Sequence, residues 1–213
     1  MNIATTRGPA KGAKSSLSLP NVLTCARIAA IPVVVGCIYA QSVANAPLWL
    51  RWVAVAVFIA AAITDYLDGY YARIWNQFSA FGRMLDPIAD KLLVASCLLM
   101  LAADGTINGW SLWAAIVILC REILVSGLRE YLAALRVSVP VTKLAKWKTT
   151  IQLIAIGFLL AGEAGDQAIS ASVGPVITLA GTALLWISAL FTIYTGWDYF
   201  RHGIHHVLEE DGG

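Results

Sequence analysis

Apolar stretches of about 20 residues recur along this chain and are separated by short polar connectors. About 20 apolar residues in a helix cross the hydrocarbon core of a bilayer, so each stretch can span a membrane. The 213 residues are 59% hydrophobic and only 13% charged, whereas soluble domains carry roughly 25% charged residues. We therefore predict an all-α polytopic membrane protein with six transmembrane helices, over about residues 22–43, 47–73, 83–103, 110–135, 148–163 and 173–200.

The chain shows no internal repeat and no second domain. We expect one membrane domain over residues 17–201, preceded by a flexible basic cytoplasmic tail (1–16) and followed by a polar cytoplasmic tail (202–213). The glycine-containing connectors ADGTING (103–109) and GEAGDQ (162–167) are predicted to be turns on the outer side.

The positions of lysine and arginine predict the orientation. If the N-terminus lies in the cytoplasm and six spans follow, every lysine and arginine except Arg51 falls at or near the cytoplasmic side. Both termini are then cytoplasmic. The net charge of +2 is too small to indicate a nucleic-acid partner, so we expect none.

Four aspartates, Asp65, Asp68, Asp86 and Asp90, join the second and third predicted spans. Carboxylates at a membrane boundary are costly unless they are neutralised, so they mark a candidate functional site. At ~100° per residue, the first two share one face of a helix and the last two share a face of the next. Carboxylate oxygens suit Mg²⁺ or Mn²⁺, and we predict that the four acids hold two such ions at the cytoplasmic side.

Two divalent ions could bridge a pyrophosphate and neutralise a leaving phosphate, while a carboxylate takes the proton of an attacking hydroxyl. Two alternatives stay open. The acids could pair with Arg73, Arg83 and Lys91 in a solvated loop. The protein could also be a cation or proton transporter, although such proteins carry acids near the midplane, and here the acids cluster at one end.

Residues 65–90 match D-x2-D-G-x2-A-R-x8-G-x3-D-x3-D at every fixed position. This run resembles the signature of the CDP-alcohol phosphatidyltransferases. The resemblance implies that Asp65, Asp68 and Asp86 bind metal, and that Asp90 contacts metal and is the candidate catalytic base. It also implies that a further set of positions holds the cytidine diphosphate portion of a lipid, namely Gly69, Ala72 and Arg73.

The segment LPNVLTCAR (19–27) precedes the first span and fits a pattern, LPNxLTxxR, that many members of this family show beside the nucleotide. The resemblance places Asn21, Thr24 and Arg27 there. On composition alone, helix capping and an arginine that snorkels to the interface explain these residues equally well.

Four further segments, WNQ (75–77), LDPIADK (85–91), REILVSGLREYLA (121–133) and KWKTTIQ (146–152), resemble the bacterial phosphatidylglycerophosphate synthases. The resemblance implies transfer of a phosphatidyl group from CDP-diacylglycerol to sn-glycerol 3-phosphate, as a step of phospholipid biosynthesis in the bacterial inner membrane. It implies a homodimer surrounded by membrane lipid, with the acceptor phosphate near Arg121, Arg129, Lys146 and Lys148. These synthases often have glycine where this chain has Ala145.

The acceptor is not fixed by these segments alone. The same basic residues could simply be the positive residues of cytoplasmic loops. Inositol phosphate and phosphatidylglycerol are the alternative acceptors within the family.

Overall fold

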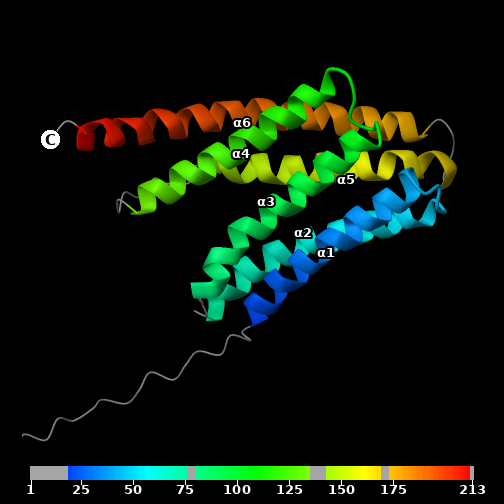
Figure 1. Cartoon of the computed structure of the whole chain (residues 1–213), viewed down its shortest axis with the longest axis horizontal. Helices are drawn as coiled ribbons and strands as arrows, with labels where there is room; N and C mark the ends of the chain where they lie inside the picture. Colours follow the sequence, from blue (N-terminus) through cyan, green and yellow to red (C-terminus); the bar gives the residue numbers. More distant parts are fainter. Residues whose placement is uncertain (1–18, 76–79, 135–142, 169–172, 212–213) are drawn as a thin grey trace, which may run out of the picture.

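The computed structural model describes residues 19–75, 80–134, 143–168 and 173–211. Their regular structure is entirely helical and consists of α1 (Leu19–Ser42), α2 (Trp49–Trp75), α3 (Ala80–Ala103), α4 (Ser111–Ala134), α5 (Lys143–Ala168) and α6 (Val173–Asp211) (Figure 1). The prediction of six helices is confirmed. The basic tail at 1–16 lies outside the described residues, and the boundaries of the membrane domain stay a prediction.

Two helix pairs form the frame of the molecule. α5 packs along α6, and α1 packs along α2 (Figure 1). α4 lies against α6, α3 packs on α1, and α2 contacts α5, so the two pairs are joined into one unit. All six helices contribute to one apolar core, whose buried members include Ile38, Phe58, Leu98, Ile118, Leu159 and Leu185.

Three described helical segments are long and apolar enough to cross a membrane: Asn21–Ser42, Ser111–Ala133 and Val173–Arg201. A shorter apolar segment, Trp147–Gly162, lies in α5. The outward surface carries large apolar side chains, of which Ile123 and Leu179 are each 71% exposed. Contiguous exposed apolar surface is costly in water, so a lipid environment suits this surface.

The predicted turn at 103–109 is confirmed, because the chain leaves α3 there and both glycines have positive φ, +81° at Gly105 and +49° at Gly109. The turn predicted at 162–167 is wrong, because α5 continues to Ala168. Its glycines allow close helix packing instead: a Cβ atom at Gly165 would lie 3.0 Å from Ile177 Cδ1 of α6. Likewise, α6 continues to Asp211, past the predicted start of the polar tail at residue 202.

Arg51 is the basic residue that the predicted topology leaves on the outer side, and it is completely buried. Its Nη1 lies 2.5 Å from Asp104 Oδ2, and the Asp104 side chain is only 1% exposed. Its Nε donates to the carbonyl oxygen of Leu160 in α5 at 3.0 Å, and its Nη2 donates to Thr106 Oγ1 at 3.2 Å. This arginine therefore ties α2, the α3–α4 turn and α5 together at one end of the molecule.

Replacing Arg51 with methionine should lower the free energy of unfolding by about 3–5 kcal/mol, because Asp104 would keep a buried charge without its partner. Thermal unfolding in detergent micelles measures the effect. The double variant Arg51→Met, Asp104→Asn is the control, and its loss should be smaller than the sum of the two single losses. Strict additivity would mean that the ion pair contributes nothing of its own.

Candidate active site

The predicted site residues of α2 and α3 lie where the start of α1, the end of α2 and the start of α3 meet (Figure 1). The carboxylate of Asp65 interacts electrostatically with those of Asp86 and Asp90, so acids from α2 and α3 lie near one another. Among the described side chains, no group of three or more acids, histidines or cysteines is close enough together to hold a metal ion. Asp68 belongs to α2, but its side chain lies outside the described set, so the four-carboxylate metal site stays a prediction.

α1 supplies the direct partners of these acids. Arg27 Nη1 lies 2.5 Å from Asp65 Oδ1, and the arginine side chain is fully buried while the carboxylate is 37% exposed. Thr24 Oγ1 donates a hydrogen bond to Asp86 Oδ1. Asn21 is also buried in this stretch of α1, and Thr24 and Arg27 of the LPNxLTxxR segment contact the acids. A buried, paired arginine does not snorkel, and that interpretation of Arg27 is wrong.

The acid cluster fits a divalent cation by its chemistry. Asp65 interacts electrostatically with Asp86 and with Asp90, and the ion pair with Arg27 balances part of this negative charge. We call these three acids the acid cluster; as they stand, their side chains are not close enough together to hold a metal ion. Hard carboxylate oxygens with unbalanced negative charge are the donors that Mg²⁺ and Mn²⁺ prefer. Lys91 Nζ contacts Ser126 Oγ of α4 at 2.5 Å and also interacts electrostatically with Asp90, so the alternative pairing of the acids with Lys91 stays open. The side chains of Arg73 and Arg83 lie outside the described set.

The second group of predicted residues lies where α4 meets α5 and α6. Glu122 forms an ion pair with Lys148, which is only 3% exposed, and its Oε1 lies 3.7 Å from Arg121 Nη1. Arg121 Nη2 also donates to Thr195 Oγ1 of α6 at 2.8 Å. Gly196 allows this approach, because a Cβ atom there would lie 3.0 Å from Arg121 Cγ.

Arg129 is fastened to α6 by an aromatic residue. Its Nη2 donates to the hydroxyl of Tyr199 at 3.1 Å, and its guanidinium lies 5.3 Å from the centre of that ring. No motif in the sequence indicated Tyr199 or Thr195, and only the spacing of Thr195 with the other buried hydroxyl residues of α6, Ser188 and Thr192, could have done so. The side chain of Lys146 lies outside the described set.

A cavity of about 570 Å³ lies between α3 and α4, next to these groups. Its charged lining residues are Lys91, Arg121, Glu122, Arg129 and Glu130. We call it the basic cavity. It lies near the acid cluster, because Asp90 interacts electrostatically with Glu122, which lines the cavity, and with Lys148. The acid cluster and the basic cavity are therefore neighbours.

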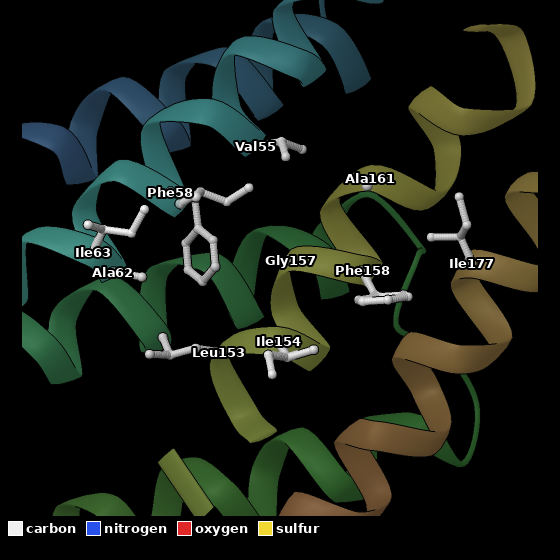
Figure 2. A pocket seen from close by; sticks show the side chains of 11 residues that line it. Val55, Phe58, Ala62, Ile63, Leu153, Ile154, Gly157, Phe158, Ala161 and Ile177 are labelled. Atoms are coloured by element: carbon white, nitrogen blue, oxygen red, sulfur yellow. The ribbon is translucent and has the colours of Figure 1, made fainter. Parts of the chain in front are cut away.

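An apolar groove of about 610 Å³ lies between α2, α5 and α6 (Figure 2). Phe58 of α2 points across it towards Gly157 of α5, where an added Cβ atom would lie 3.9 Å from Phe58 Cε1. Phe58, Ala62 and Asp65 are spaced four and three residues apart, so the groove follows the α2 face that carries the acid. Ile63 on its rim is 53% exposed, so the groove opens sideways to the surroundings of the helix.

Comparison with known proteins agrees with this arrangement. A protein of Cereibacter sphaeroides named CDP-diacylglycerol–glycerol-3-phosphate 3-phosphatidyltransferase is 40% identical, over 91% of this chain and 98% of its own length. A Rickettsia bellii protein of the same name is 46% identical, over 86% of this chain and 94% of its own length. A protein of Oryza sativa named cardiolipin synthase (CMP-forming) is 37% identical, over 87% of this chain and 57% of its own length.

The family model described as CDP-alcohol phosphatidyltransferase matches residues 17–194, which include all six helices in whole or in part. The match covers both the acid cluster and the residues of α4 and α5 around the basic cavity. On this match, and on the relatives that align over most of its length, the chain belongs to the CDP-alcohol phosphatidyltransferase family.

Proposed function

We propose that this protein transfers the phosphatidyl group of CDP-diacylglycerol to sn-glycerol 3-phosphate, which gives phosphatidylglycerol phosphate and CMP. The observation that carries the proposal is the proximity of the acid cluster to the basic cavity, since Asp90 interacts electrostatically with Glu122, which lines that cavity. A diphosphate-linked lipid needs cations held by acids, whereas a phosphorylated acceptor needs basic donors. Two relatives that align with nearly their whole length carry the name of this enzyme.

Family members use a divalent metal, and Asp65, Asp68, Asp86 and Asp90 would hold two Mg²⁺ or Mn²⁺ ions here. Bound there, the ions would neutralise charge on the pyrophosphate of the lipid substrate. Arg27 and Thr24 of α1 keep Asp65 and Asp86 in fixed positions for this task. The nucleotide contacts are assigned by the family motif to Asn21, Gly69, Ala72 and Arg73.

The transfer is a displacement at phosphorus. Asp90 accepts the proton of the acceptor hydroxyl, the hydroxyl oxygen forms a bond to the phosphatidyl phosphorus, and the bond from that phosphorus to CMP breaks. Asp90 suits this part because it is half-buried and interacts electrostatically with Asp65 and with Glu122, which lines the cavity. The acceptor phosphate is bound on the α4 and α5 side, by Arg121, Arg129, Lys146 and Lys148.

Phosphatidylglycerol is the second candidate acceptor, because the rice relative is named a cardiolipin synthase. We further propose that the protein is a homodimer in the bacterial inner membrane, with its termini and its active site in the cytoplasm. The placement of lysine and arginine supports this topology.

The function is tested with purified protein in detergent micelles, labelled CDP-diacylglycerol and each acceptor in turn. CMP and phosphatidylglycerol phosphate should form with glycerol 3-phosphate, and a chelator should stop the reaction until Mg²⁺ or Mn²⁺ is restored. Turnover with phosphatidylglycerol or inositol phosphate but not with glycerol 3-phosphate would refute the proposed acceptor and leave the proposed reaction class standing. Ion flux in liposomes without any CMP release would refute the transferase.

Replacing Asp90 with asparagine should lower kcat about 10²–10⁴-fold, because the hydroxyl proton would lose its acceptor. Circular dichroism and thermal unfolding should show a folded protein. Asp104→Asn is the control, since it neutralises a carboxylate at the other end of the molecule, and its kcat per folded molecule should match that of the wild type. Normal turnover by folded Asp90→Asn would exclude Asp90 as the base.

We propose that one acyl chain of the lipid substrate lies in the apolar groove between α2, α5 and α6 (Figure 2). Gly157→Leu would fill the groove and should raise KM several-fold for long-chain CDP-diacylglycerol, with little change for a short-chain analogue. Gly36→Leu is the matched control, because it adds the same volume in open space on α1. Equal effects on both chain lengths, or an equal effect of Gly36→Leu, would mean that the groove holds only bulk lipid.

A further inference from the structure

We propose that Lys91 is a specificity-determining residue, which binds the phosphate of the acceptor in the basic cavity and so selects a phosphorylated alcohol. This inference rests on the proposed function, and it adds to the site a residue that neither the metal-binding nor the nucleotide-binding positions include. Its structural basis is the position of the lysine between the acid cluster and the cavity.

Lys91 immediately follows Asp90 on α3. Consecutive helical side chains project ~100° apart, so two neighbouring residues can serve two adjacent compartments. Asp90 interacts with Asp65 in the acid cluster, whereas Lys91 lines the basic cavity and reaches Ser126 of α4. An acceptor that places its hydroxyl at Asp90 therefore finds an ammonium group one residue further along the same helix.

The other cations around the cavity already have partners on α4 or α6. Arg121 already lies near Glu122 and donates to Thr195, and Lys148 is paired with Glu122. Arg129 donates to Tyr199 and stacks over its ring. Glu130 adds a second negative charge at the exposed side of the cavity.

Lys91 differs from Arg121 and Lys148 in its direct contact. It differs from Arg129, which also bonds a neutral hydroxyl, in following Asp90 directly on α3. Within the described residues, its Nζ bonds directly to a neutral hydroxyl, that of Ser126, and not to a carboxylate. An ammonium group binds a phosphate oxygen much more strongly than a hydroxyl, because both partners of that hydrogen bond are charged. Lys91 also interacts electrostatically with the neighbouring Asp90, but a phosphate entering the cavity can displace Ser126 without breaking a salt bridge from Lys91 to a described carboxylate.

This arrangement also explains how the acceptor is chosen. Glycerol 3-phosphate carries a free hydroxyl and a phosphate at opposite ends of three carbons, so it can reach Asp90 and Lys91 together. Glycerol has the hydroxyl but no phosphate, and it would leave Lys91 on Ser126. Discrimination between the two acceptors should therefore depend on the positive charge at residue 91.

The test compares four variants by their KM for glycerol 3-phosphate, KM for CDP-diacylglycerol, and kcat. Lys91→Met should raise KM for glycerol 3-phosphate about 10- to 100-fold, the range expected for a lost charged hydrogen bond. KM for CDP-diacylglycerol should stay within about twofold of the wild-type value, because the lost hydrogen bond is made to the acceptor and not to the lipid. Lys91→Arg should restore most of the acceptor affinity, because it restores the charge.

Two variants separate the charge of Lys91 from its link to α4. Lys91→Gln removes the charge and can keep the hydrogen bond to Ser126, so it should reproduce the effect of Lys91→Met. Ser126→Ala removes the link and keeps the charge, so it should raise the acceptor KM far less. If Ser126→Ala reproduces the full effect while Lys91→Gln does not, Lys91 merely fastens α3 to α4 and the inference is overturned.

The outcomes also separate this inference from the proposed function. A wild-type protein that releases no CMP with glycerol 3-phosphate would refute the function itself. An active wild type whose folded Lys91→Gln variant keeps a normal acceptor KM, or loses affinity equally for both substrates, would overturn only the role of Lys91. Thermal unfolding identifies any variant that is not folded. If either Lys91→Met or Lys91→Gln fails to fold, the KM values of the other one decide the role of Lys91.

Discussion

The buried ion pair between Arg27 and Asp65 is the interaction on which the site depends. A guanidinium group that is removed from water at a membrane boundary is tolerated only where a carboxylate compensates its charge. The pair therefore fixes the distance between α1 and α2 at the level of the acid cluster. The hydrogen bond from Thr24 to Asp86 does the same for α3, so that α1 holds both acid-bearing helices in register.

A second buried arginine works at the opposite end of α2. Arg51 and Asp65 lie on the same helix, and their separation in sequence corresponds to about 21 Å along the helix axis at 1.5 Å per residue. This distance is most of the hydrocarbon thickness of a bilayer. One end of the bundle is therefore fastened by a pair that is sealed from solvent, while the other end keeps its carboxylate partly open to ligands.

Sequence patterns predict those features that depend on local spacing. The lengths of the apolar stretches predicted six helices, and the spacing of the aspartates predicted that acids from α2 and α3 face each other. The turn predicted at 162–167 failed because glycine permits both a turn and a close helix contact, and only the neighbouring α6 distinguishes them. The contacts of Lys91 with Ser126 and of Arg129 with Tyr199 join residues 35 and 70 positions apart, which no local pattern reveals.

Three environments lie close to Asp65 and Asp90: an apolar groove near Asp65, the cluster of acids, and a basic cavity near Asp90. The two substrates dissolve in different places: the lipid with its diphosphate stays in the membrane, and the small anionic acceptor stays in water. A site that brings them together must therefore border both lipid and water. The bordering helices achieve this by simple spacing. On α2 the apolar face passes into the acid within one turn, from Ala62 to Asp65, and on α3 the acid and the lysine are consecutive residues. The charged residues Asp65, Asp90 and Lys91 therefore lie where α2 and α3 leave the apolar core, and there a substrate can reach them.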